Sequence, residues 1–185
     1  MLVFLDTEFT DLLNPVLLSL GLVTLDGRKL YAELDLNTDV GKACVQASSD
    51  FVRNGGVLDQ WGCVPGASGT AWEIGRRTGE WLLGLATEYS VKVEVAFDYS
   101  ADYELMQYAI RDSGLWDQVR KVVIPVNVNS ITGTVTGELA AEECFRELGK
   151  RGFKRHHALA DALALRAAYL AVKAVALAHA CSKNT

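Results

Sequence analysis

The chain has 185 residues, of which 50% are hydrophobic and 22% are charged. This length and composition suit one folded domain over residues 1–185 and exclude an intrinsically disordered chain. The formal net charge of −5 argues against a protein that coats nucleic acid by electrostatic attraction alone. It leaves open an enzyme that acts on nucleic acid at one local site.

Four cysteines are spread along the chain: Cys44, Cys63, Cys144 and Cys181. None belongs to a CxxC pair, so we expect free thiols in a reducing compartment rather than a zinc ribbon or a disulfide framework. No basic region precedes the apolar start of the chain, so we expect no signal peptide. The most apolar stretch, residues 158–180, is alanine-rich and carries charged side chains, which does not favour a membrane span. We therefore expect a soluble, cytoplasmic protein.

The chain opens with three predicted strands. Residues 2–6 are short, apolar and aromatic, as in a buried strand. Residues 16–25 and 28–36 are apolar runs separated by Asp26-Gly27, which favours a β-hairpin with a type I′ turn. The second and third strands should therefore be antiparallel.

After the hairpin, helices and strands alternate. We expect helices at residues 48–54, 70–89, 100–112, 137–149 and 158–180, and strands at residues 91–97 and 121–126. Ser48 or Ser49 can cap the first helix and Thr70 the second, while Pro125 places the last strand at an edge or an end. The glycine-rich stretch 55–69 is expected to be a loop. This order predicts an α/β fold with a mixed sheet of five to six strands and flanking helices.

Two carboxylates, Asp6 and Glu8, lie at the end of the first predicted strand. Because side chains alternate along a strand, these two share one face and Thr7 takes the other. Carboxylates at the end of a buried strand are unfavourable unless a cation lies between them, and their oxygens suit Mg²⁺ or Mn²⁺. An acidic strand end exposed to solvent in a loop is the alternative, and this pattern alone does not exclude it.

Two further carboxylates fall on apolar stripes of predicted helices. Asp102, in the first turn of its helix, shares a face with Leu105, Met106, Ala109 and Ile110. Asp161 shares a face with Leu165, Ala168, Val172 and Val175. Both side chains should therefore face the core and need a compensating partner. Helix capping is the alternative role for Asp102, and a buried salt bridge is the alternative for Asp161.

A pair of histidines precedes the last helix. His156 lies five residues before Asp161, so it should lie above the same site. The ordinary histidine pKa of about 6.5 suits a general base near neutral pH. His157 is the rival for this role.

Three stretches carry a resemblance to a known family: Phe4-Leu-Asp6-Thr-Glu8-Phe9, Asp98-Tyr-Ser-Ala-Asp102-Tyr-Glu-Leu and His156-His-Ala-Leu-Ala-Asp161-Ala. They resemble the three exonuclease motifs of the DEDD superfamily, in its histidine-bearing DEDDh branch. By the spacing of the third motif, His156 is the matching histidine and His157 is a bystander. The DTEF form of the first motif and the stretch Ser49-Asp-Phe-Val-Arg53-Asn look most like small bacterial and phage exoribonucleases of the ribonuclease AS type.

The resemblance implies a ribonuclease-H-like fold and a 3′–5′ exonuclease that releases nucleoside 5′-monophosphates with two Mg²⁺ ions, or with Mn²⁺. Asp6 would contact both metals, Glu8 and Asp161 the first, and Asp102 the second, mainly through water. His156 would be the general base. The implied partners are single-stranded RNA or DNA 3′ ends, and a homodimer is expected because several relatives are dimers.

Substrate contacts through the backbone and by stacking are expected from Thr7, Phe9 and Thr10, in or directly after the first motif, with core packing as the alternative for Phe9. A further contact is expected from Arg53, supplied by the short second helix or by a partner subunit. Many relatives carry His-Asn-Ala-x-Phe-Asp in the second motif, and a literal match of its Phe-Asp pair would choose Asp98 over Asp102. Asp98 is therefore kept as an auxiliary ligand or a substrate contact. RNA is the expected substrate. A DNA exonuclease of proofreading type and an inactive nucleic-acid-binding module on the same fold are the alternatives.

Overall fold

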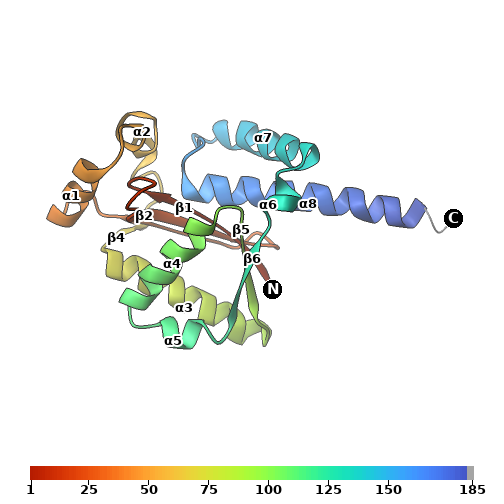
Figure 1. Cartoon of the computed structure of the whole chain (residues 1–185), viewed down its shortest axis with the longest axis horizontal. Helices are drawn as coiled ribbons and strands as arrows, with labels where there is room; N and C mark the ends of the chain where they lie inside the picture. Colours follow the sequence, from red (N-terminus) through yellow and green to blue (C-terminus); the bar gives the residue numbers. More distant parts are fainter. Residues whose placement is uncertain (183–185) are drawn as a thin grey trace.

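The computed structural model of the chain describes residues 1–182, with side chains to residue 180 (Figure 1). Its strands form one six-stranded sheet in the order β4-β3-β2-β1-β5-β6. They are β1 (Leu2–Phe9), β2 (Leu17–Thr24), β3 (Lys29–Leu34), β4 (Ser68–Gly69), β5 (Val93–Phe97) and β6 (Val123–Asn127). The sheet is mixed, because β2 is antiparallel to β1 and β3 whereas β1, β5 and β6 are parallel.

The helices cover both faces of this sheet. They are α1 (Asp39–Ala47), α2 (Asp50–Asn54), α3 (Ala71–Tyr89), α4 (Ser100–Asp112), α5 (Trp116–Val119), α6 (Asn129–Thr132), α7 (Val135–Gly149) and α8 (Ala158–Ser182), with a 3₁₀ helix η1 at Leu58–Gln60. Figure 1 shows α3, α4 and α5 on one side and α7 and α8 on the other. The predicted α/β fold is therefore confirmed, and it is consistent with a ribonuclease-H-like architecture.

The central strand β1 is apolar and buried over its first half and polar at its carboxyl end. Val3, Phe4 and Leu5 are fully buried, because helices cover this part of the sheet on both faces. The polar residues come only at its carboxyl end. There Asp6 pairs with Gly21 of β2, and Glu8 pairs with Ser19.

The predicted hairpin forms, but its turn type differs from the expectation. The Thr24 amide donates to the Arg28 carbonyl at 2.9 Å, which leaves three residues in the loop. Gly27 has a φ of 96°, whereas Asp26 is not among the described non-glycine residues with positive φ. A type I′ turn needs two left-handed residues, so that prediction is wrong. The extra loop residue allows the strands to close with one left-handed residue, at Gly27.

The helix predictions hold for the long elements. Thr70 caps α3 in a reciprocal capping box with Glu73, and Ser49 rather than Ser48 caps α2. Pro125 lies on the edge strand β6, as expected. The helix α1 was missed, although Thr38 caps it by accepting a bond from the Gly41 amide at 3.0 Å. An internal glycine weakens a helical pattern, which hid this element.

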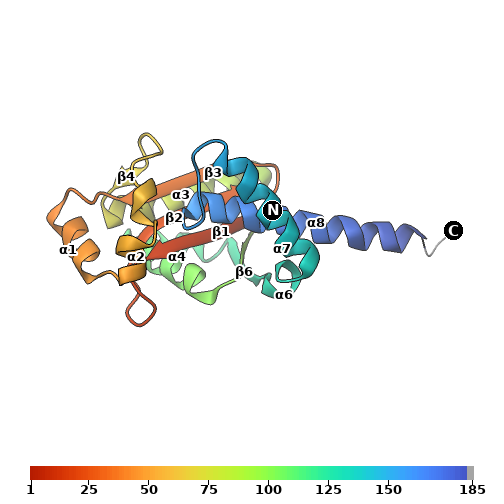
Figure 2. The ribbon, with the colours of Figure 1, turned by 90° about the horizontal axis from the view of Figure 1, so that it is seen from above.

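Helix α8 extends well past the sheet (Figures 1 and 2). Ala162 and Ala168 in its first half are buried, whereas Val175 is 43% exposed, so the expectation that Val175 lies on a core face is wrong. Among the described residues, 158–180 is the one helical stretch long and apolar enough to cross a bilayer, a property that core helices of soluble proteins share. The predicted free thiols are confirmed for Cys44, Cys63 and Cys144; the Cys181 side chain lies outside the described part.

Candidate metal centre

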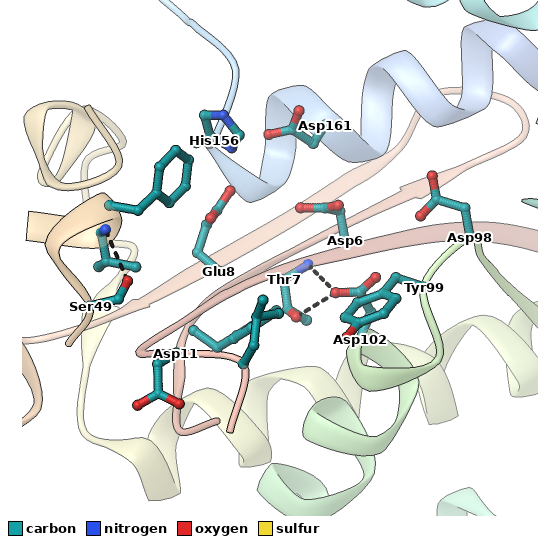
Figure 3. A pocket seen from close by; sticks show the side chains of 14 residues that line it. Asp6, Thr7, Glu8, Asp11, Ser49, Asp98, Tyr99, Asp102, His156 and Asp161 are labelled. Carbon is teal, nitrogen blue, oxygen red and sulfur yellow. Dashed lines mark hydrogen bonds between the residues drawn. The ribbon is translucent and has the colours of Figure 1, made fainter. Parts of the chain in front are cut away.

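Five carboxylates converge at the carboxyl end of β1 (Figure 3). They are Asp6, Glu8, Asp98, Asp102 and Asp161. They form two groups, Asp6 with Glu8 and Asp161, and Asp6 with Asp98 and Asp102, and within each group one ligand oxygen per residue lies within 4.8 Å of the others. Asp6 belongs to both groups. The four carboxylates chosen from the sequence therefore lie together, and Asp98 joins them.

The topology explains this convergence. β1 and β5 are parallel neighbours, so their carboxyl ends meet at one edge of the sheet. Asp98 follows β5 directly, and Asp102 comes in the first turn of α4. The start of α8 lies against β2, where a Cβ placed on Gly21 would come within 2.4 Å of the Ala158 carbonyl oxygen. This close approach brings Asp161 next to Asp6.

Burial and mutual repulsion disfavour the charged form of these carboxylates. Burial, and then Asp161 and the other acids, raises the pKa of Asp6 well above its ordinary value. The same causes raise the pKa of Glu8 to about 8. Burial raises the pKa of Asp102 and that of Asp161 to about 7. The cluster therefore retains protons near neutral pH unless cations replace them.

No ion pair among the residues that the structure describes neutralises this charge. Every such pair lies elsewhere on the surface. The buried salt bridge considered for Asp161 is thus not formed in the described part of the chain. Arg155 lowers the pKa of Asp161 slightly from a distance but forms its ion pair with Glu142. The ring of oxygen donors fits Mg²⁺ or Mn²⁺ by the chemistry of its donors.

Two local contacts hold the helical carboxylates in place. The Thr7 hydroxyl and the Thr7 amide donate to the same Asp102 oxygen at 2.6 Å and 3.2 Å (Figure 3). The His157 amide donates to Asp161 at 3.0 Å, which ties that carboxylate to the start of α8. Because the Thr7 amide is already used, Thr7 positions a ligand, and the expected substrate contact through its backbone is not supported.

The two histidines have different surroundings. His156 lies over Glu8 and beside Asp161 in Figure 3, and its ring meets the Phe51 ring edge-on at 4.8 Å between centroids. Burial and the nearby Arg155 lower the pKa of His156, which keeps its ring neutral and able to accept a proton. His157 is buried and stacks on Tyr31 at 4.4 Å, away from the cleft.

A cleft of about 570 Å³ opens over the carboxylates. Beside these acids and Thr7, its lining comprises Phe9, Asp11, Leu12, Ser49, Phe51, Val52, Tyr99 and His156. Phe9 and Tyr99 stack at 6.4 Å between centroids, and Leu12, Phe51 and Tyr99 are exposed. Sequence reasoning named only Phe9 from this apolar rim. The exposed aromatic residues Phe51 and Tyr99 were inside the quoted motifs and could have been singled out.

Two predicted substrate contacts lie away from this cleft. Thr10 is buried, its hydroxyl accepts from the Val16 amide at 3.0 Å, and its carbonyl accepts from the Ser49 amide at 2.9 Å. Thr10 therefore joins β1 to α2. The Arg53 guanidinium pairs with Asp50 at 2.5 Å on the outer side of α2. The buried Thr10 therefore does not line the cleft, and α2 turns Phe51 and Val52, not Arg53, to the cleft of its own chain. A contact of Arg53 with the site of a partner subunit stays a prediction.

A second cleft of about 340 Å³ continues past the acids on the side of α6 and α7. It shares Asp6, Asp98 and Asp161 with the first cleft and adds Asn129 and Arg155. The carboxylates thus lie between an apolar cleft and a more polar one. An extended ligand could cross the acidic cluster from one to the other.

Comparison with known proteins gives no family assignment, because no protein-family model and no curated protein matches this sequence. The geometry of the carboxylates is therefore the basis on which a function can be proposed.

Proposed function

We propose that the chain is a metal-dependent 3′–5′ exonuclease that acts on single-stranded RNA. The observation that carries this proposal is that two clusters of three carboxylate side chains lie side by side and share Asp6. A shared carboxylate between two oxygen-lined sites is the arrangement expected for two-metal hydrolysis of a phosphodiester.

The residues present fit a pair of hard divalent cations. Asp6, Glu8 and Asp161 would hold one Mg²⁺ or Mn²⁺, and Asp6, Asp98 and Asp102 would hold the other. When bound, the cations would supply a water of lowered pKa and stabilise the leaving 3′ oxygen. Asp98, which the sequence left as either an auxiliary ligand or a substrate contact, is proposed here as a ligand alongside Asp102.

Protein side chains would accept the proton, orient a metal ligand and stack against the substrate base. His156, neutral and above Glu8, would accept the proton of the attacking water. Thr7 would keep Asp102 oriented. The apolar rim of Phe9 and Tyr99 would stack against the base of the terminal nucleotide.

The motif resemblance supports digestion in the 3′-to-5′ direction and a preference for RNA over DNA. The spacing of the three motifs resembles that of DEDDh exonucleases, and the first motif resembles the ribonuclease AS type. These resemblances also support a homodimer that releases nucleoside 5′-monophosphates from the 3′ end.

The test is degradation of matched RNA and DNA oligomers that carry a 5′ label, with Mg²⁺ or with EDTA. We expect a Mg²⁺-dependent ladder that shortens from the 3′ end, faster on RNA, with nucleoside 5′-monophosphate as product. Asp6→Asn should abolish the ladder. Faster loss of DNA would favour the proofreading-type alternative. Binding without Mg²⁺-dependent turnover would refute the proposal and favour an inactive binding module.

A further inference from the structure

The backbone at His156 adopts an uncommon conformation. Its φ of 62° lies in the left-handed region, where non-glycine residues are rare and persist only when the surrounding structure holds them. No hydrogen bond found in the described chain uses the His156 ring, which contacts Phe51 edge-on. The direction of the ring therefore depends on what holds the backbone on either side.

On the following side, two contacts anchor the chain. The His157 amide donates to Asp161, and the His157 ring packs between Tyr31 and Phe153, at 4.4 Å and 4.9 Å between centroids. These contacts fix the start of α8. Phe153 belongs to the segment that leads into His156, and the His156 backbone also hydrogen-bonds to Asp161. Lys154 and Arg155, between these contacts, are held by a further side chain.

On the preceding side, one buried side chain from a distant part of the sequence holds the backbone. Gln60, only 4% exposed, donates from Nε2 to the Arg155 carbonyl at 2.9 Å. Its Oε1 accepts from the Lys154 amide at 2.6 Å. The nitrogen and the oxygen of one side-chain amide thus both hydrogen-bond to the backbone of the two residues that precede His156. We propose that Gln60 is a positioning residue, which sets the orientation of the general base without touching substrate.

Gln60 can serve this purpose because its own segment is attached to the sheet. Trp61 donates from its indole nitrogen to the Leu34 carbonyl at 2.8 Å. The Gly62 amide donates to the buried Glu33 carboxylate at 3.0 Å. A continuous set of hydrogen bonds therefore runs from β3, through residues 60–62, to the residue before His156. The role of Gln60 rests on the proposed function, in which His156 accepts a proton.

The sharpest variant is Gln60→Met, which keeps the length of the side chain and removes both hydrogen bonds. We expect kcat to fall by about tenfold to a hundredfold, the scale expected when a reacting group is misplaced by about 1 Å. KM and the affinity for Mn²⁺ should not change, because Gln60 lines neither cleft. Gln118→Met is the matched control, since it makes the same change at an exposed glutamine of α5 that lines neither cleft. It should retain kcat.

A double-mutant cycle identifies the route of the effect. If Gln60 acts through His156, Gln60→Met should change kcat by less than about twofold in a His156→Ala background. The same fold-loss in both backgrounds, or no loss in the wild-type background, would overturn the proposal. Absence of Mg²⁺-dependent nuclease activity in the parent protein would instead refute the proposed function.

The two hydrogen bonds from Gln60 to the backbone of Lys154 and Arg155 form a clamp, which amide hydrogen exchange tests independently of activity. In Gln60→Met the Lys154 amide loses its acceptor, so its exchange should accelerate, together with that of its neighbours up to His156. Amides of α3 should be unchanged. Unaltered exchange at Lys154 would refute the clamp whether or not the protein is a nuclease.

Discussion

Gly21 of β2 lies directly beside Asp6 of β1, and it also receives the first turn of α8. The absence of a side chain at this one position lets the Asp161 helix approach the sheet at the level of the central carboxylate. A glycine therefore determines the distance between two of the proposed metal ligands. The same register places Ser19 beside Glu8 two pairs further along.

Gly21→Ala should damage both stability and metal binding. The new Cβ would lie 2.4 Å from a backbone oxygen of α8, which cannot move without the helix. We expect a loss of about 1–3 kcal/mol in the free energy of unfolding, measured in urea, and weaker Mn²⁺ binding. Gly84→Ala is the control, because a Cβ there meets nothing within 4 Å. Unchanged Mn²⁺ affinity in Gly21→Ala would contradict the role of this contact.

Asp6→Asn should separate stability from activity. The substitution removes the acid that the other four carboxylates repel, so the metal-free protein should become more stable. Because the pKa of Asp6 lies well above its ordinary value, we expect a higher free energy of unfolding for Asp6→Asn than for the parent protein, measured in urea with EDTA. Nuclease activity should be lost. Asp59→Asn, an exposed carboxylate outside both clefts, should change neither quantity; a destabilised Asp6→Asn would show that the cluster is not under repulsion.

The pH dependence of stability should reveal the acidic cluster. Glu8 has a pKa raised from 4.5 to about 8, and Asp102 and Asp161 have pKa values raised from 3.8 to about 7. The folded protein therefore binds more protons than the unfolded chain between these limits, so this contribution to stability is complete below about pH 4 and is lost as the pH rises to 8.

Urea unfolding in EDTA at pH 5 and pH 8 measures this effect, and we expect lower stability at pH 8. Saturating Mg²⁺ should raise stability most at pH 8, because it binds the deprotonated carboxylates. Stability that rises with pH in EDTA, with no effect of Mg²⁺, would contradict a metal-binding cluster.

The two histidines should respond differently to alanine. His156→Ala should lower kcat by about 10²–10⁴-fold, the usual contribution of a general base, and leave the unfolding midpoint almost unchanged. His157→Ala should reduce activity less but destabilise the protein by roughly 2–4 kcal/mol, because it empties a buried site between Tyr31 and Phe153. His157→Phe should restore much of that stability. Equal losses of activity in the two alanine variants would show that the general base is assigned to the wrong residue.

Thr7→Val should weaken the second metal site specifically. Valine keeps the shape of threonine and removes the 2.6 Å hydrogen bond to Asp102. Loss of a contact that orients a ligand lowers metal affinity by about 10–100-fold, so one of two Mn²⁺ binding steps should weaken in calorimetry. Thr78→Val is the control, since it removes a buried hydroxyl bond to Ile74 far from the clefts. Equal Mn²⁺ affinities in Thr7→Val and the parent protein would contradict the role of Thr7.

Local patterns were sufficient for several features. The apolar run before Asp6 predicted a buried strand, and the placement of Asp102 and Asp161 on apolar stripes predicted carboxylates that face inward. Capping signals located α3, and Asp26-Gly27 located the hairpin. Each of these features depends on periodicity or backbone preference within a few residues, which is information that a single sequence contains.

Tertiary structure alone decided which side chains meet. The parallel pairing of β1 with β5 brought Asp98 into the acidic cluster, and the way α2 packs turned Phe51 inward and Arg53 outward. The Thr10 contacts and the Gln60 clamp join segments that are far apart in the chain. Periodicity shows which face of an element a residue occupies, but the partner of that face depends on sheet order and helix packing, which are properties of the whole fold.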